Sequence, residues 1–248
     1  MIITATAIKG GSGKTATVAA LAQAAVQDRN SVLTVDLDPQ GNLSSYIGGD
    51  LMRSGTSEIL HGEDPAKCIQ QTEQGIDLLS ASLNLSAEKS AAGSAMRLRK
   101  AIEHLDYDLI LVDSPPMLCE LTYNAIYAAD EVIIPLLADP GSLQGLYQAV
   151  GAVSHIQKNS KHKIAIKGSV ITAFDRRSKI NRFYHDTIED VGSQVGAPLL
   201  ITIRQSIAVK ESLACQESLF KRAPKCNAAK DYQSLYTMLI SERRSTNG

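Results

Sequence analysis

Short runs of consecutive apolar residues alternate along the chain with longer stretches whose apolar positions recur every three or four residues. Apolar runs of this length are typical of strands buried on both faces, and the longer period is typical of helices. Strands are predicted at the N-terminus and over residues 31–35, 75–80, 107–113, 131–135, 163–172 and 198–203. Helices are predicted over 14–28, 94–105, 142–158 and 228–240, and another begins within 204–212.

This order of elements predicts one α/β domain over residues 1–248, a mostly parallel twisted sheet with helices on both faces. Residues 48–75 are polar and rich in glycine, so we expect a surface excursion there. The last helix has an apolar stripe that predicts docking on the sheet: Tyr232, Leu235, Tyr236, Leu239 and Ile240. Residues 242–248 look frayed.

The first strand is followed directly by the sequence K-G-G-S-G-K-T at residues 9–15. Gly10, Gly11 and Gly13 allow a tight turn whose N–H groups point inward, and such a turn before a helix binds anions. Lys14 supplies a positive charge for terminal phosphates, and Thr15 supplies a hydroxyl for magnesium. The loop departs from G-x-x-x-x-G-K-[ST] because the first glycine position is Ile8 and Lys9 is additional.

A dinucleotide site is the alternative interpretation of this loop. Gly11, Gly13 and Ala16 match G-x-G-x-x-A, and Asp36 follows about 20 residues later, where a ribose contact is expected. That site has no use for Lys14 and Thr15 together, nor for Lys9. The loop therefore favours a phosphate-binding site and the P-loop NTPase-like version of the α/β fold.

Three carboxylates follow predicted strands. Asp36 and Asp38 belong to D-L-D-P-Q-G-N, a loop after the second strand, and Asp113 ends an apolar strand before S-P-P. The carboxyl ends of parallel strands meet at the edge where open sheets bind ligands. Carboxylates at this edge can hold the water shell of magnesium and orient an attacking water.

Charge is distributed unevenly, although the net charge of the 248 residues is only −1. Residues 1–150 carry 9 Lys/Arg and 18 Asp/Glu, a net charge of −9, whereas residues 151–248 carry 16 and 8, a net charge of +8. The basic half is either a polyanion-binding face or a solvated surface.

The four cysteines have no metal-ligand spacing, and neither a signal peptide nor a bilayer-spanning run is expected.

With these motifs in order, the sequence resembles the ParA-type partition ATPases of the ParA/MinD superfamily along nearly its whole length. The resemblance is carried by K-G-G-S-G-K-T, D-L-D-P-Q-G-N, L-V-D-S-P-P, T-A-F-D-R-R-S-K, V-K-E-S and the terminal A-A-K-D-Y. The first of these is similar to the family's deviant Walker A loop. The chain is most similar to the small type, which lacks an N-terminal helix-turn-helix domain.

The resemblance implies a magnesium-dependent ATPase that acts as a slow switch. Thr15, Asp36 and Asp113 would hold magnesium, and Asp38 would position the attacking water. Lys9 would stabilise phosphate across an ATP-dependent homodimer, and Lys14 would act within its own chain. Cofactor contacts would come from Lys9, Gly10, Gly11, Ser12, Gly13, Lys14, Thr15 and Ala16. Arg204 and Gln205, where the family has P-R-N, would lie near the adenine.

The family also implies non-specific DNA binding by the ATP-bound dimer, stimulation by a ParB-like centromere-binding protein, and a cytoplasmic, nucleoid-associated location without membrane binding. The candidate DNA-binding residues are Arg176, Arg177, Lys179, Arg182, Lys210, Lys221, Arg222 and Lys225.

Three other functions remain as alternatives. A MinD-like membrane-cycling ATPase needs a C-terminal amphipathic helix, and S-E-R-R-S-T-N-G at 241–248 lacks the apolar residues for one. An iron–sulfur reductase of the nitrogenase type would use Cys119, which follows Asp113, but a bridging cluster needs a second suitably placed cysteine. A nicotinamide-dependent oxidoreductase would use the dinucleotide pattern.

Overall fold

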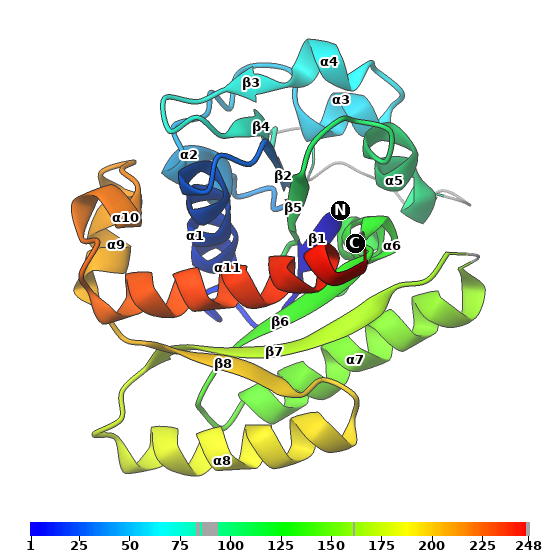
Figure 1. Cartoon of the computed structure of the whole chain (residues 1–248). Helices are drawn as coiled ribbons and strands as arrows, with labels where there is room; N and C mark the ends of the chain where they lie inside the picture. Colours follow the sequence, from blue (N-terminus) through cyan, green and yellow to red (C-terminus); the bar gives the residue numbers. More distant parts are fainter. Residues whose placement is uncertain (83–84, 86–93, 161, 247–248) are drawn as a thin grey trace.

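A computed structural model describes residues 1–82, 85, 94–160 and 162–246 of the chain (Figure 1). In this part of the chain the strands are β1 (Ile2–Ala5), β2 (Val32–Asp36), β3 (Gln70–Gln71), β4 (Asp77–Leu79), β5 (Leu109–Asp113), β6 (Glu131–Leu137), β7 (Ala165–Phe174) and β8 (Leu199–Arg204). The α-helices are α1 (Lys14–Gln27), α2 (Asn42–Tyr46), α3 (Thr56–Leu60), α4 (Pro65–Cys68), α5 (Arg97–Ile102), α6 (Glu120–Ala128), α7 (Ser142–Asn159), α8 (Lys179–Gln194), α9 (Ile207–Ala214), α10 (Leu219–Arg222) and α11 (Asn227–Thr246).

The described strands form one sheet in the order β3-β4-β2-β5-β1-β6-β7-β8. Every neighbouring pair is parallel except β3 with β4, which is antiparallel. The prediction of a mostly parallel sheet is therefore confirmed. β1 lies between β5 and β6, so the loop after β1 and the loops after β2 and β5 emerge at the same edge.

Side chains alternate between the two faces of the sheet because successive strand residues point in opposite directions. Ile3 of β1 packs with α1 and α11 on one face, whereas Ile2 packs with α5 and α6 on the other. The outer strands are covered on this second face by α7 and α8. Figure 1 shows α11 on one side of β7 and β8, and α7 and α8 on the opposite side. The predicted helices on both faces are confirmed.

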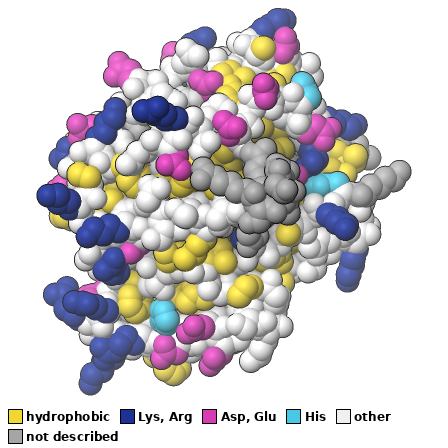
Figure 2. Space-filling model, viewed as in Figure 1, with side chains coloured by type: hydrophobic (Ala, Val, Ile, Leu, Met, Phe, Trp, Pro, Cys, Tyr) yellow, Lys and Arg dark blue, Asp and Glu magenta, His cyan; other side chains and the backbone are white. Residues whose placement is uncertain are grey.

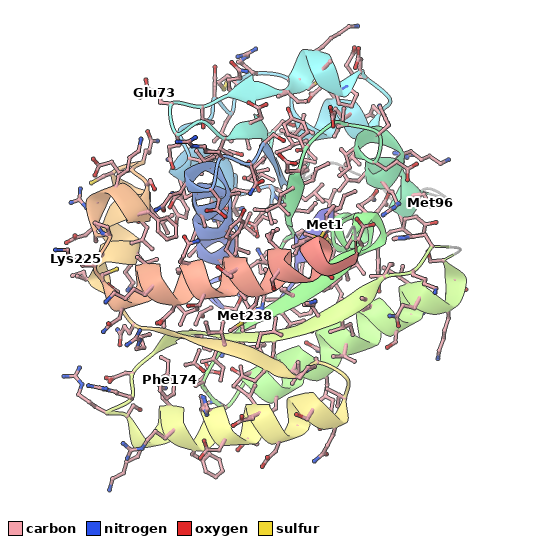
Figure 3. All side chains as sticks on the ribbon, in the orientation of Figure 1. Met1, Glu73, Met96, Phe174, Lys225 and Met238 are labelled. Atoms are coloured by element: carbon pink, nitrogen blue, oxygen red, sulfur yellow. The ribbon has the colours of Figure 1, made fainter. Side chains whose placement is uncertain are left out.

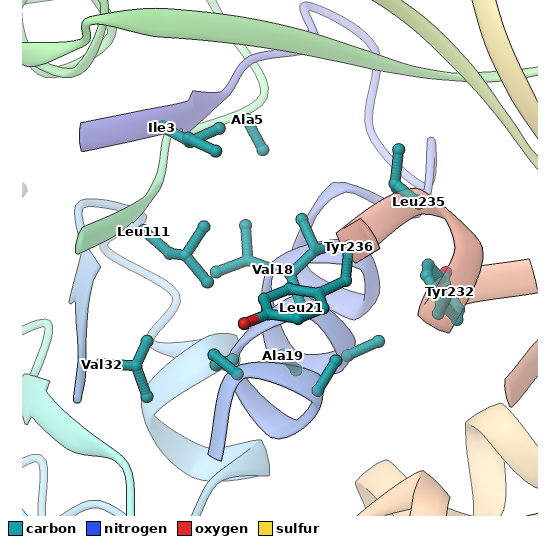
Figure 4. Close-up of a cluster of buried hydrophobic side chains, with 14 of the residues drawn as sticks. Ile3, Ala5, Val18, Ala19, Leu21, Val32, Leu111, Tyr232, Leu235 and Tyr236 are labelled. Carbon is teal, nitrogen blue, oxygen red and sulfur yellow. The ribbon is translucent and has the colours of Figure 1, made fainter. Parts of the chain in front are cut away.

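The core against α1 joins the start and the end of the chain. The alanine-rich face of α1 lies between the strands and α11, so the two helices approach closely (Figure 4). Tyr232, Leu235, Tyr236 and Leu239 are buried there, whereas Ile240 is partly buried. The predicted apolar stripe of the last helix thus packs on α1 as well as on β8. α11 extends to Thr246, into the segment expected to fray.

Residues 48–75 differ from the expected surface excursion. They contain α3, α4 and β3, and Ile59, Leu60 and Cys68 are buried in the core with β2 and β5. A few buried apolar side chains attach this polar segment to the core. They do not recur in a periodic pattern, so the sequence did not predict these elements. The predicted helix over 94–105 is shorter in the structure, with a 3₁₀ turn over Ser94–Met96 followed by α5.

Candidate nucleotide-binding site

The phosphate loop links β1 to α1 and is held by the first turn of that helix. Gly13 has a φ of 80°, and its carbonyl oxygen accepts hydrogen bonds from the backbone N–H of Thr17 (2.9 Å) and from Thr17 Oγ1 (2.8 Å). A Cβ at Gly13 would lie 2.7 Å from Thr172 Oγ1, so both the φ value and the space require glycine. The structure therefore has the tight turn that the sequence predicted.

Thr172 is a residue of the site that the sequence did not reveal. Its buried hydroxyl donates a hydrogen bond to the carbonyl oxygen of Ser12 (2.7 Å), which joins the phosphate loop to β7. The next residue, Ala173, has a φ of 49°, which is unusual for a residue with a side chain. The only sequence signal was the position of Thr172 in T-A-F-D, and its contact partner lies 160 residues away.

Lys14, Thr15 and Asp113 form one cluster at the edge of the sheet, and Lys14 and Asp113 are buried in it. Lys14 Nζ lies 2.9 Å from Asp113 Oδ1, and Thr15 Oγ1 donates a hydrogen bond to Asp113 Oδ2 (2.7 Å). Burial raises the pKa of Asp113, and the charge and hydrogen bond of Lys14 oppose this shift. Both loop side chains therefore face the carboxylate that the sequence assigned to magnesium.

Asp36 lies opposite Asp113 in the register of β2 and β5, and both side chains are fully buried. The carboxylate of Asp36 accepts hydrogen bonds from Ser44 N (2.9 Å), Ser44 Oγ (2.7 Å) and Asp38 N (3.1 Å). Burial, with the adjacent Asp113 carboxylate as the second cause, raises the pKa of Asp36 to about 7. Two carboxylates and the Thr15 hydroxyl are hard oxygen ligands of the kind that fit magnesium, and a divalent cation would offset the repulsion between them.

Asp38 is buried beside the phosphate loop. Its Oδ1 accepts a hydrogen bond from the backbone N–H of Gln40 (3.0 Å), which fixes the D-L-D-P-Q-G-N turn between β2 and α2. Asp38 lines a cavity of about 490 Å³ together with phosphate-loop residues 9–16. The carboxylate thus faces the same space as Lys14 and Thr15, which is the arrangement needed to orient a water molecule toward a terminal phosphate.

A second cavity, of about 390 Å³, adjoins the phosphate loop and is more apolar. Its lining includes Leu137, Ala173, Ile203, Arg204, Gln205, Ile207, Val209 and Tyr232. Arg204 and Gln205, which the resemblance implies lie near the adenine, thus line a cavity that adjoins the phosphate loop. The Arg204 guanidinium forms a two-pronged ion pair with Asp231, with Nε at 2.9 Å and Nη2 at 2.6 Å from the carboxylate oxygens.

Lys9 lies at the opposite end of the phosphate loop from Lys14. It lines the 490 Å³ cavity, and its Nζ forms an ion pair with Asp139, in the loop between β6 and α7. Burial disfavours ionisation of Asp139, but hydrogen bonds from Lys9 and Ser142 outweigh it and hold the pKa of Asp139 below its usual range. In this single chain, Lys9 is thus held by a carboxylate of its own subunit.

The eight candidate DNA-binding residues are all exposed, but their surroundings differ. Arg177 pairs with Asp175, and Arg222 pairs with Glu217 and Glu211. Arg182 donates a hydrogen bond to the carbonyl oxygen of Arg176 (2.9 Å). Figure 2 shows Lys and Arg side chains along the left margin of this face, from α9 and α10 down to the start of α8. Lys225 projects from this margin in Figure 3.

The cysteines are free thiols, and Cys119 is partly exposed at the start of α6. Across the described residues, His185, Asp186 and Glu189 on α8 are the one set of three potential metal ligands close enough together to share an ion, and none is a cysteine. No described helix combines the length and apolar character needed to cross a membrane.

The central strand of this mostly parallel sheet, β1, leads through the phosphate loop into α1, which bears Lys14 and Thr15. This arrangement defines a P-loop NTPase fold. A family model described as an AAA domain matches residues 1–166. The chromosome partitioning protein ParA of Caulobacter vibrioides is 31% identical, over 95% of this chain and 92% of that protein. The chromosome-partitioning ATPase Soj of Thermus thermophilus is also 31% identical, over 92% and 90%. The chain therefore belongs to the ParA/MinD family of NTPases.

Solved structures agree with this fold. A cobyrinic acid a,c-diamide synthase from Mycobacterium smegmatis with a bound ATP analogue and magnesium has a TM-score of 0.84 and 27% identity, with 99% of this chain and 96% of that chain covered. An ATP complex of McdA from Cyanothece has a TM-score of 0.86 over 97% and 96% of the two chains. At 21% identity, the likeness to McdA shows the fold alone.

Proposed function

We propose that the protein is a DNA partition ATPase that hydrolyses ATP to ADP and phosphate as a switch. The observation that carries this proposal is the convergence of Lys14, Thr15, Asp36, Asp38 and Asp113 on one edge of the sheet, at or beside one cavity. The relatives that share most of the chain are partition proteins, and a solved relative binds an ATP analogue with magnesium.

Positioning and neutralisation of charge by this chain's residues account for the chemistry. Lys14 exchanges Asp113 for the terminal phosphates of ATP, and the loop amides of residues 10–16 bind the phosphate oxygens. Asp38 orients the attacking water. Thr15, Asp36 and Asp113 would hold magnesium, whose positive charge would offset the negative charge that develops on the phosphate.

Dimerisation makes this reaction a switch. Lys9 is exposed enough to leave Asp139 and reach the phosphates of ATP in a second subunit. ATP would then join two subunits, and its hydrolysis would remove the anion that attracts Lys9 across the interface. A ligand that interacts differently with two states shifts their populations, so ATP would favour the dimer and ADP the monomer.

The dimer would bind DNA through exposed basic residues along the margin formed by α10 and the start of α8. Phosphate contacts of this kind carry no sequence preference and are strongly salt-dependent. A ParB-like centromere-binding protein would stimulate hydrolysis. The ATPase would then leave the nucleoid for the surrounding cytoplasm. We include the partner and its cargo in the proposal because this chain is similar to chromosome-partitioning proteins.

DNA binding by the Asp38→Ala variant tests the proposal. The variant should bind ATP, form a stable dimer and remain on non-specific duplex DNA, whereas the wild type should release DNA as ATP is consumed. Sedimentation and fluorescence anisotropy are measured with ATP, ADP and no nucleotide at several salt concentrations. The slope of log affinity against log salt should be about −0.9 for each phosphate contacted.

Asp28→Ala is the matched control because Asp28 is an exposed carboxylate at the far end of α1. This variant should hydrolyse ATP like the wild type. Normal hydrolysis by Asp38→Ala would refute the role of Asp38. DNA binding that is equal with ATP and ADP would refute the switch.

A further inference from the structure

The two cavities at the phosphate loop share a border. Gly11, Gly13, Ala16, Lys210 and Leu213 line both of them. Lys210 is the one charged member of this set, and it lies on α9 between the apolar cavity and the phosphate loop. A cation at this border can contact both compartments.

The other cations that line these cavities are already paired. Lys14 is bound to Asp113, Lys9 to Asp139, and Arg204 to Asp231. In the described part of the chain, Lys210 has neither a hydrogen bond nor an ion pair. Its ammonium group can therefore bind a ligand phosphate without first leaving a carboxylate.

We propose that Lys210 binds the α-phosphate of the nucleotide and determines affinity for ATP and ADP alike. The inference rests on the proposed function, in which the base occupies the apolar cavity and the terminal phosphates lie at Lys14 and Thr15. The α-phosphate joins the base-bearing sugar to the terminal phosphates, so it lies at the border of the two cavities. This role replaces DNA binding, which the sequence suggested for Lys210.

Lys210→Met tests the inference because methionine keeps an apolar stem of similar length and removes the charge. Calorimetric titration without DNA should give dissociation constants for ATP and ADP that both rise about tenfold, the size expected for one charge-assisted hydrogen bond. Lys210→Arg should stay within about threefold of the wild type. Lys158→Met in the last turn of α7 makes the same change of charge outside both cavities and should bind nucleotide normally.

The outcomes separate this inference from the proposed function. If wild-type protein binds ATP and Lys210→Met binds it equally well, Lys210 has no role at the nucleotide and the partition ATPase stands. A loss confined to ATP would place the ammonium group at the γ-phosphate and overturn the α-phosphate assignment. Weaker DNA binding at saturating ATP with unchanged nucleotide affinity would return Lys210 to the DNA surface. Failure of the wild type to bind ATP would overturn both proposals.

Discussion

The two ends of the phosphate loop each carry a lysine paired with an aspartate, yet the two ion pairs lie in different environments. The side chains of Lys14 and Asp113 are 5% and 0% exposed, whereas those of Lys9 and Asp139 are 38% and 28% exposed. Removing one partner of a buried pair leaves an uncompensated charge, which is costly, but an exposed pair is screened by water. Lys14 would therefore act on a nucleotide bound in its own subunit, whereas Lys9 can leave Asp139 for a phosphate of a second subunit.

Lys14→Ala should have the largest effect of the substitutions considered. It should abolish detectable ATP binding and also lower the free energy of unfolding of the nucleotide-free protein by about 3 kcal/mol, because Asp113 loses its buried cation. Calorimetry and urea unfolding measure the two effects separately. Adding Asp113→Asn should restore stability but not ATP binding. A Lys14→Ala protein as stable as the wild type would contradict the claim that breaking the buried Lys14–Asp113 pair leaves a costly charge.

Lys9→Ala should have a smaller effect on stability and a selective effect on function. The free energy of unfolding should fall by at most about 1 kcal/mol, because the lost ion pair is partly exposed to water. ATP should still bind to the monomer, whereas dimerisation and hydrolysis should be lost. Sedimentation and phosphate release with ATP check both points. Dimers of normal stability would show that Lys9 does not act across an interface.

The sequence predicted the parts of the site that are local in the chain. Lys14 and Thr15 follow the glycine turn directly, and Asp113 ends an apolar run, so short motifs were sufficient. Residues that position these groups could not be predicted in this way. Ser44 bonds Asp36, Thr172 bonds Ser12 and Asp139 bonds Lys9, and the last two contacts join β7 and the β6–α7 loop to the phosphate loop. Such pairs depend on the order of strands in the sheet.

Most strands and several helices were predicted to within a few residues because their apolar runs are long. α8 was not predicted as a helix over its full length. Its apolar residues Tyr184, Ile188 and Val191 recur at helical spacing and pack in the core, so this stripe was a signal that the sequence offered, although Ile180 and Phe183 on the same helix are exposed. The two-residue β3 was also missed, since Gln70–Gln71 has no strand pattern and pairs with β4 through a turn.

Asp36→Asn should sharpen the comparison because Asp36, unlike Asp113 and Asp139, has no bonded lysine or arginine among the described residues. The pKa of Asp36 is raised to about 7, so protonation stabilises the fold at low pH and this stabilisation disappears as the pH rises toward 7. Without metal, the wild type should lose about 2 to 3 kcal/mol from this residue between pH 5 and pH 8. Asp36→Asn should remove this pH dependence, as urea unfolding across that range would reveal. An unchanged slope would mean that Asp36 is ionised throughout.

Asp139→Asn should have the smallest effect and tests whether the Lys9 pair restrains dimerisation. Asparagine can still accept the hydrogen bonds that Gly141 and Ser142 donate to Asp139 Oδ1, so the turn before α7 is preserved. Lys9 loses only its charged partner, and the ATP-bound dimer should become about threefold tighter, the scale of an exposed ion pair. Asp175→Asn, which removes the charged partner of the exposed Arg177, should leave the dimer unchanged. If Asp139→Asn weakens the dimer instead, Asp139 acts at the interface itself and Lys9 needs that carboxylate to be positioned toward the second subunit.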